Sequence, residues 1–211
     1  MEYIYISLYS YVSGSIPFGL ILTKIFNNKD IRKVGSGNIG ATNVYRTGNK
    51  ILAIFTLIFD MGKGYLPVYI SYKFYPDYVL LSALVAFLGH LFPVWLKFKG
   101  GKGVATYLGI LFALSIGLSI LFIFTWITVI LIFNYSSISS IFSSLTVFVV
   151  TVYRELFHVM HYGEFAQDIP PNYLLVDNLK WLLFIFLILI IFTHKKNIYN
   201  LKNGTETKIK I

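Results

Sequence analysis

The chain contains no cysteine and few charged residues. With no cysteine among its 211 residues, disulfide bonds and thiolate chemistry are excluded, although this absence indicates no particular compartment. Charged residues make up only 13% of the chain, whereas a soluble globular domain carries roughly 25%. This shortage of charge argues against an ordinary soluble domain.

Acidic residues are scarcer than basic ones, with 9 Asp and Glu against 18 Lys and Arg and a formal net charge of +9. The basic residues lie between and after apolar runs rather than along one stripe. This distribution indicates cytoplasmic loops of a membrane protein and not a nucleic-acid-binding surface. We therefore expect no nucleic-acid partner.

The rest of the chain is strongly apolar, with 56% hydrophobic residues and a mean hydropathy of +0.70. Several runs approach the roughly 20 residues that cross a bilayer. The first run follows Met1-Glu2 without a basic segment, so we expect a transmembrane helix and not a cleaved signal peptide. We predict an all-α integral membrane protein with seven transmembrane helices. They lie near residues 3–25, 51–72, 78–96, 104–116, 118–133, 138–153 and 179–193.

The stretch 104–133 decides the number of helices because it is too long for one ordinary span and short for two. If the stretch formed one helix, the lysine-rich tail would lie outside the cell and the acidic segment 154–178 would lie in the cytoplasm, against the positive-inside rule. Two short helices that turn near Ser115-Ile116-Gly117 place both segments on the sides that the positive-inside rule favours. Tilt or local thinning of the bilayer accommodates short helices. We therefore predict the N-terminus outside and the C-terminus in the cytoplasm.

This topology assigns the loops of a single membrane domain, residues 1–211, to the two sides. The loops 24–50 and 97–106 and the tail 194–211 are expected in the cytoplasm. The segment 154–178 is expected outside, as a cap or an amphipathic interfacial segment.

A proline interrupts the first apolar run, within the segment Ser13–Gly19. Pro17 cannot donate to the helix backbone, and glycine loosens a helix. The segment is either a broken helix whose freed carbonyls face protein or water, or a kink whose small residues allow close packing.

The segment Val34–Arg46 alternates three glycines with Ser, Asn and Thr. Such a run exposes backbone N–H groups and hydroxyls toward an anion, and Arg46 offers a bidentate fork to phosphate. A G-x-G-x-x-G spacing occurs at Gly35–Gly40, but no strand precedes it, so a dinucleotide site lacks its structural context. We predict an anion-binding loop here.

A second basic motif, Lys99–Gly103, stands just before an apolar run. Glycines beside Lys102 let the backbone approach a ligand that the ammonium neutralises, and a helix N-terminus would add a favourable dipole. We interpret Lys97 and Lys99 as interfacial side chains that snorkel. A lone histidine at a span end, such as His90, is more often structural, although its ordinary pKa permits proton transfer.

Two polar pairs stand three residues apart on predicted helices. Asp60 and Lys63 lie inside the second span, where charge is costly, and we interpret them as a mutual ion pair that positions the helix. His194 and Asn197 share a helix face at the inner end of the last span. They either return to the cytoplasmic loops or form a solvated helix end.

The motifs lie on one predicted membrane face and lack clustered carboxylates. They suit one or two anions and suit divalent metals poorly, so we expect no metal and no other cofactor. No H-x-x-x-x-D pair occurs, so an acyltransferase built on these residues would need an activated donor. A transporter of a phosphorylated small molecule also suits broken helices and basic groups, but it predicts an internal repeat, and none is evident. A membrane scaffold gives no reason for the glycine-rich loop.

Together the motifs resemble the PlsY family, the acyl-phosphate:glycerol-3-phosphate acyltransferases of bacteria. The resemblance covers nearly the whole chain except about 153–178, a segment longer and more polar than the family's usual connection. The matching strings are Gly14–Pro17, Gly35–Asn43, Gly89-His90, Gly100–Thr106, and His194-x-x-Asn197 with Gly204–Glu206.

The resemblance implies an enzyme of the bacterial cytoplasmic (inner) membrane with its active site on the cytoplasmic side. It implies transfer of a fatty acyl group from acyl phosphate to the sn-1 hydroxyl of glycerol 3-phosphate. The products would be lysophosphatidic acid and phosphate, and neither acyl-CoA nor acyl carrier protein would be the direct donor. The partners would be the two substrates and membrane lipid, and we expect a monomer.

The resemblance also implies the site residues. The expected catalytic residues are Ser36, Arg46, Lys102, His194 and Asn197. The expected phosphate-binding and substrate-binding residues are Gly37, Asn38, Thr42, Asn43, His90, Gly101 and Gly103. We hypothesise that Arg46 and Lys102 neutralise substrate phosphates. Ser36 and His194 would orient the attacking hydroxyl and the donor phosphate, so positioning and charge stabilisation would supply most of the rate.

Overall fold

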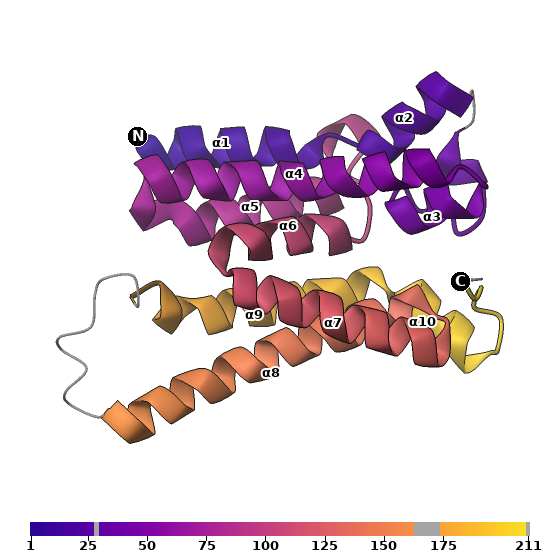
Figure 1. Ribbon diagram of the computed structural model, residues 1–211. Coiled ribbons are helices and arrows are strands. Elements are labelled where there is room, and N and C mark those ends of the chain that lie inside the picture. The colour runs from indigo at the N-terminus through magenta and orange to yellow at the C-terminus, as the bar shows by residue number, and fades with distance from the viewer. Residues whose placement is uncertain (28–29, 163–173, 210–211) are drawn as a thin grey trace.

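The computed structural model describes residues 1–27, 30–162 and 174–209, with backbone alone for 155–162 and 174–177. Every regular element in these ranges is helical, as predicted, and the helices form two layers (Figure 1). The first layer holds α1 (Glu2–Ser15), α2 (Phe18–Asn27), α3 (Ala41–Arg46), α4 (Lys50–Phe74), α5 (Val79–Leu91) and α6 (Val104–Leu114). The second holds α7 (Ile116–Phe133), α8 (Ser136–Tyr162), α9 (Leu174–Thr193) and α10 (Lys195–Lys202). Short 3-10 turns lie at η1 (Ile31–Lys33), η2 (Pro76–Tyr78) and η3 (Val94–Leu96).

Most of these helices are long and apolar enough to cross a membrane. Within the described ranges, five segments qualify: Glu2–Asn27, Lys50–Phe74, Pro76–Leu96, Ile116–Phe133 and Ser136–Arg154. The helical pair Asn178–Thr193 and Lys195–Lys202, bent by 55°, would make a sixth span. Helix α6 is apolar but only 11 residues long. A helix therefore stands at each of the seven predicted positions.

The boundaries differ most around the predicted external segment 154–178. Helix α8 continues to Tyr162 rather than ending near 153, and α9 already begins at Leu174. Residues 154–178 are therefore partly helical, and the stretch between these two helices lies outside the described residues.

The predicted interruption of the first apolar run is present at Pro17. Helix α1 ends at Ser15, and Ile16 is extended with φ −66° and ψ 119°. Helix α2 begins after Pro17, which has no N–H to continue the ladder of α1. Gly14 approaches α5 so closely that a Cβ would overlap the carbonyl oxygen of Ala86. The segment thus combines a broken helix with close packing of a small residue.

The predicted turn inside the stretch 104–133 lies at Ser115. This residue separates α6 from α7 and is extended, with φ −162° and ψ 114°. Its hydroxyl accepts a hydrogen bond from Leu118 N at 3.4 Å, as an N-cap does at the start of a helix. The separation of this stretch into two helices is therefore confirmed.

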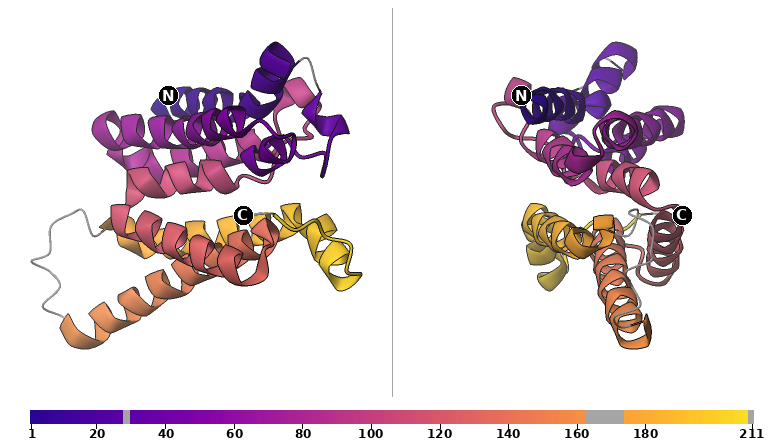
Figure 2. Two further views of the ribbon diagram at one scale, coloured as in Figure 1. Left: turned by 45° about the vertical axis from the view of Figure 1, so that its right-hand side comes forward. Right: turned by 90° about the vertical axis from the view of Figure 1, so that its left-hand side faces the viewer.

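Aromatic side chains join the two layers. The ring of Phe186 on α9 lies 4.6 Å from that of Phe87 on α5 and 5.6 Å from that of Tyr107 on α6, measured between centroids. Tyr107 also meets Phe122 of α7 at 5.5 Å. All four rings are buried. These contacts fix the position of one layer on the other. The right-hand view of Figure 2 shows the two layers from one end.

Candidate active site

The described parts of the predicted cytoplasmic loops meet at one end of the helices, opposite the N-terminus (Figures 1 and 2). This end carries α2 and α3, the connection between α5 and α6, and α10 with the tail that follows it. The first three belong to one layer and the last to the other. Residues far apart in the sequence can therefore form one site.

Asn43 organises the glycine-rich segment from within. Its side chain is buried, and Nδ2 donates to the carbonyls of Ile31, Val34 and Asn38 at 3.2, 2.9 and 2.8 Å. Its Oδ1 accepts from Ser36 N at 3.0 Å. The amide is thus occupied by the loop backbone. Asn43 was expected to bind substrate, but the structure places it behind the loop, as its support.

Two glycines give the segment its curvature around Ser36. Gly35 and Gly37 have φ of 56° and 74°, in a region that residues with a Cβ rarely adopt. The side chains of Ser36, Asn38 and Thr42 are only partly buried. These three expected site residues therefore remain accessible to a ligand.

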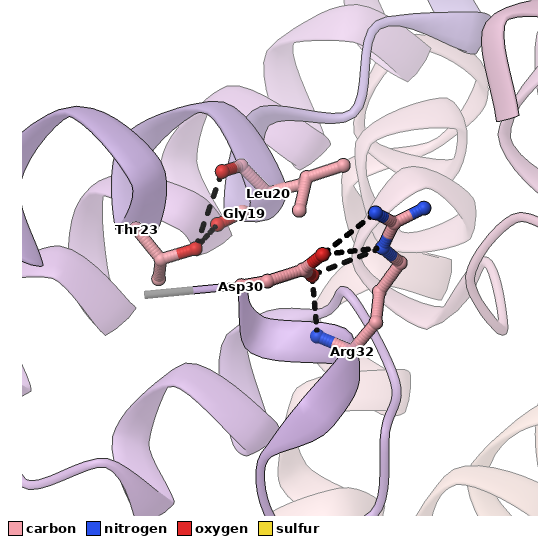
Figure 3. Close-up of polar contacts among 5 residues, drawn as sticks. All are labelled: Gly19, Leu20, Thr23, Asp30 and Arg32. Carbon is pink, nitrogen blue, oxygen red and sulfur yellow. Dashed lines mark hydrogen bonds and ion pairs between the residues drawn. The ribbon is translucent and has the colours of Figure 1, made fainter. Parts of the chain in front are cut away.

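An ion pair holds the turn before this segment (Figure 3). Arg32 Nη2 donates to Asp30 Oδ2 at 2.7 Å, and Arg32 Nε donates to Asp30 Oδ1 at 2.9 Å. Asp30 Oδ1 also accepts from Arg32 N at 3.0 Å and so caps η1. These hydrogen bonds, together with the charge of Arg32, hold the pKa of the Asp30 carboxyl below its ordinary value. Arg32 is thus paired with Asp30 rather than presented to a phosphate.

Arg46, at the end of α3, points toward the C-terminal tail. Its Nη2 donates to the carbonyl of Thr207 at 2.9 Å. Its Nε is buried, and no residue in the described part of the chain accepts a hydrogen bond from it. An unmet buried donor costs roughly 1–3 kcal/mol. Arg46 therefore retains a donor that an anion could satisfy.

A chain of hydrogen bonds ties Lys102 to the C-terminal region. Lys102 Nζ donates to Asn197 Oδ1 at 2.6 Å, and Asn197 Nδ2 donates to Glu206 Oε1 at 2.6 Å. Ser137 Oγ donates to the same carboxylate oxygen at 3.2 Å. An ammonium only donates and a carboxylate only accepts, so the chain sets the orientation of the Asn197 amide. The expected site residues Lys102 and Asn197 are in direct contact.

His194 lies between α9 and α10 and is buried. Its Nδ1 is 2.8 Å from the carbonyl of Ile190. A carbonyl oxygen can only accept, so Nδ1 carries the proton. In the neutral ring Nε2 is then an acceptor, available to a hydroxyl.

Burial and neighbouring charge lower the pKa of two site residues. Burial lowers the pKa of Lys102 to about 8; the charge of Glu206 opposes this shift, and Arg46 and Lys196 add to it. Burial, followed by the charge of Lys102, lowers the pKa of His194 to about 4. His194 is therefore neutral near pH 7, and Lys102 is mostly charged there.

His90 supports the lysine loop from below. Its Nδ1 lies 2.9 Å from Thr106 Oγ1, and its carbonyl accepts from Gly101 N at 3.2 Å. Gly101 packs so tightly on the His90 ring that a Cβ would overlap it. Gly103, with φ of 82°, turns the chain into α6. The structural interpretation of His90 therefore describes its position better than the expected contact with substrate.

The sequence profile described as "Glycerol-3-phosphate acyltransferase" matches residues 4–204. A protein of that name from Pelagibacter ubique (strain HTCC1062) is 51% identical over 100% of both chains. The chain belongs to the glycerol-3-phosphate acyltransferase family. The resemblance to PlsY is thereby confirmed.

Further relatives agree with this assignment. A glycerol-3-phosphate acyltransferase from Brucella anthropi is 44% identical, covering 96% of this chain and 90% of that one. The crystal structure of PlsY, an integral membrane glycerol 3-phosphate acyltransferase, in its glycerol 3-phosphate form matches with a TM-score of 0.82 and 32% identity. That match covers 100% of this chain and 96% of the other. The lysophosphatidic acid form of PlsY matches at 0.79 with 30% identity. The protein is thus a membrane acyltransferase of phospholipid synthesis that acts on glycerol 3-phosphate.

Two residues that contact this candidate site were not named as site residues from the sequence. Glu206 had a signal, since it ends the matching string Gly204–Glu206 and is the only acidic residue in the basic tail 194–211. Ser137, at the start of α8, had none, because only the fold brings it to Glu206. Both residues anchor the tail that Arg46 also contacts.

The candidate site presents two cations, a neutral imidazole and several hydroxyl groups. Lys102 senses the charge of Arg46 and in turn lowers the pKa of His194, so these three side chains share one electrostatic environment. No group of three or more His, Asp or Glu side chains suited to a metal occurs among the described residues. The arrangement can hold phosphate groups and orient a hydroxyl.

Proposed function

We propose that this acyltransferase takes its acyl group from acyl phosphate and transfers it to the sn-1 hydroxyl of glycerol 3-phosphate. The observation that carries the proposal is the contact of Lys102 Nζ with Asn197 Oδ1 at 2.6 Å, in a partly buried site that also holds Arg46 and the neutral His194. Both proposed substrates carry a phosphate, and two cations suit them. Acyl phosphate also has a good leaving group, so charge stabilisation matters more than a strong general acid. A cysteine-linked acyl-enzyme is excluded because the chain has no cysteine.

In the proposed reaction the acceptor hydroxyl oxygen attacks the carbonyl carbon of acyl phosphate. A bond forms from that oxygen to the acyl carbon, and the bond from the acyl carbon to the phosphate oxygen breaks. The hydroxyl proton passes to a phosphate oxygen, giving lysophosphatidic acid and phosphate. Arg46 and Lys102 neutralise the phosphates, while Ser36 and His194 orient the attacking hydroxyl and the donor phosphate.

The proposed site residues follow from these contacts. The catalytic set remains Ser36, Arg46, Lys102, His194 and Asn197. The proposed substrate-binding residues are Gly37, Asn38, Thr42, Gly101 and Gly103. Asn43 and His90 support these loops from behind, as their hydrogen bonds indicate.

We also propose seven membrane spans, with the N-terminus outside and the active site on the cytoplasmic face of the bacterial cytoplasmic (inner) membrane, in a monomer. Exposed lysines lie at the start of α4 and α10 and after η3, elements found at the end that carries the site (Figure 1): Lys50, Lys195, Lys196, Lys97 and Lys99. This distribution favours a cytoplasmic location. The short α6 spans because it is largely buried in the bundle, and the segment 154–178 lies outside.

The test is phosphate release from palmitoyl phosphate by the purified protein, with and without glycerol 3-phosphate. We expect release that depends on glycerol 3-phosphate, together with an equal amount of lysophosphatidic acid. Acylation by palmitoyl-CoA but not by palmitoyl phosphate would contradict the proposed donor. Uptake of glycerol 3-phosphate into vesicles without acylation would indicate a transporter instead.

A further inference from the structure

Asp60 and Lys63 form a buried ion pair on α4 that takes no part in the proposed chemistry. Lys63 Nζ lies 2.6 Å from Asp60 Oδ1, and the side chains are only 2% and 3% exposed. Buried charge is expensive and is commonly functional within a membrane span. The predicted pairing is confirmed, but it leaves open why the helix carries this pair.

The lysine has a second partner at the break between α1 and α2. Lys63 Nζ donates to the carbonyl of Ile16 at 2.7 Å. In a continuous helix this carbonyl would accept from a backbone N–H four residues later; here its backbone partner is Phe18 N, at 3.1 Å. Ser13 Oγ donates to the carbonyl of Lys63 at 3.2 Å, as a second link between α1 and α4. Lys63 thus stabilises the carbonyl group that the Pro17 break exposes.

The same break determines the direction of α2. Phe18, its first residue, stacks on Phe59 of α4 with centroids 5.1 Å apart. Gly19 meets the glycine-rich segment so closely that a Cβ would overlap the carbonyl oxygen of Ile39. Leu20 joins a buried cluster with Ile31, Ile39, Val44, Leu52 and Ala53. Helix α2 is therefore the wall against which the proposed anion loop packs.

The inner face of α2 has its own polar groups satisfied (Figure 3). The Thr23 hydroxyl donates to the carbonyl of Gly19 at 2.7 Å and lies 3.2 Å from that of Leu20. This face needs no polar partner from the loop, so its packing on the loop is apolar. The position of the glycine-rich segment then depends on the direction in which α2 runs after the break at Pro17.

We infer that Lys63, held in place by Asp60, is a positioning residue for the acyltransferase. By binding the Ile16 carbonyl it sets the direction of α2, and through α2 it sets the place of Ser36 relative to Lys102. The inference rests on the proposed site, because it assumes that the glycine-rich segment binds substrate. Lys63 itself touches no substrate.

The test combines kinetics with a distance measurement. The double variant Asp60→Asn with Lys63→Met removes both charges, so no unpaired charge remains buried. The cysteine-free chain accepts nitroxide labels on introduced cysteines at Ile25 of α2 and Ile54 of α4, both exposed. We expect a broadened or shifted distance distribution and a loss of roughly tenfold or more in kcat/KM for glycerol 3-phosphate. Lys73→Met, an exposed lysine on the same helix, is the matched control and should change neither.

The inference requires both the change in the distance distribution and the loss of kcat/KM. A folded double variant with an unchanged distance distribution, or with unchanged kcat/KM, would overturn the inference. If the double variant does not fold, Pro17→Ala is combined with it in a triple variant. Without the proline the helix can continue, and a backbone N–H can then replace the Lys63 ammonium as donor to the Ile16 carbonyl. We then expect a folded protein with displaced α2 and low activity, and recovery of wild-type activity would overturn the inference. Failure of the proposed donor would appear separately, in the wild-type enzyme with palmitoyl phosphate.

Discussion

Lys102 and Asn197 stand 95 positions apart in the chain, yet the lysine ammonium donates to the amide oxygen at 2.6 Å. One residue belongs to the loop before α6 in the first layer, and the other belongs to α10 in the second. The contact therefore exists only when the two layers are packed together. It brings the lysine loop and the C-terminal tail into one site.

Removal of the Lys102 ammonium should abolish most of the activity. We expect Lys102→Ala to lower kcat/KM for glycerol 3-phosphate roughly 10²–10³-fold, because a partly buried positive charge beside a phosphate stabilises the transition state. Ser36→Ala should lower it in the same assay. Lys99→Ala is the matched control, since Lys99 is an exposed lysine of the same loop. Wild-type turnover in both site variants would contradict the assigned roles.

The pH dependence of the enzyme should show the lowered pKa of Lys102. Lysine is charged below its pKa, so kcat/KM should fall as pH rises through about 8. In Lys102→Arg the guanidinium stays charged, because its pKa is above about 12. Any activity that this variant retains should lack the decline near pH 8. If kcat/KM of the wild-type enzyme stays constant up to pH 9, roughly one unit above the pKa of Lys102, the lysine charge is not required.

The charge of Glu206 should tune the same profile. Because the Glu206 charge raises the pKa of Lys102, Glu206→Gln should move the alkaline decline to lower pH while keeping an oxygen for Asn197. Lys196 lowers the pKa of Lys102, so Lys196→Met should move the decline to higher pH. Shifts in the same direction for both variants would refute this electrostatic description.

Asn43 should matter for the stability of the loop more than Asn38 does. Asn43→Ala removes four hydrogen bonds to the loop backbone and should cost about 1–3 kcal/mol as buried backbone groups lose partners. Asn38→Ala keeps the backbone carbonyl that Asn43 uses and should leave stability near wild type. Thermal denaturation of both purified variants in detergent measures the difference. Equal melting temperatures would show that Asn43 does not organise the loop.

Sequence reasoning predicted the helices well because the bilayer imposes a simple demand. A span needs roughly 20 apolar residues, and such runs are visible in the chain. The interruptions at Pro17 and Ser115 were also predictable, since one lacks a backbone donor and the other lies where an apolar stretch has the wrong length. The end of α8 was misplaced because a helix can continue through polar residues once it has left the apolar run.

The site was predicted as a set of residues but not as a geometry. Ser36, Arg46, Lys102 and Asn197 lie at one end of the helices, as expected. The supporting part of Asn43 was not predicted, and that of His90 was predicted only as a general structural role, because their partners depend on the folded chain. The sequence likewise paired Lys63 with Asp60, but its bond to Ile16 was not foreseen.

By itself, the sequence determined that this protein is an all-helical membrane chain and which family it resembles, and it predicted anion-binding motifs on one membrane face. Composition and loop charge are additive properties that can be read without coordinates. Tertiary structure alone decided which polar groups stay accessible and which support others. Each hydrogen bond needs two atoms at a definite distance and direction, and for Lys102 with Asn197 or Lys63 with Ile16 only the packing of distant helices provides them.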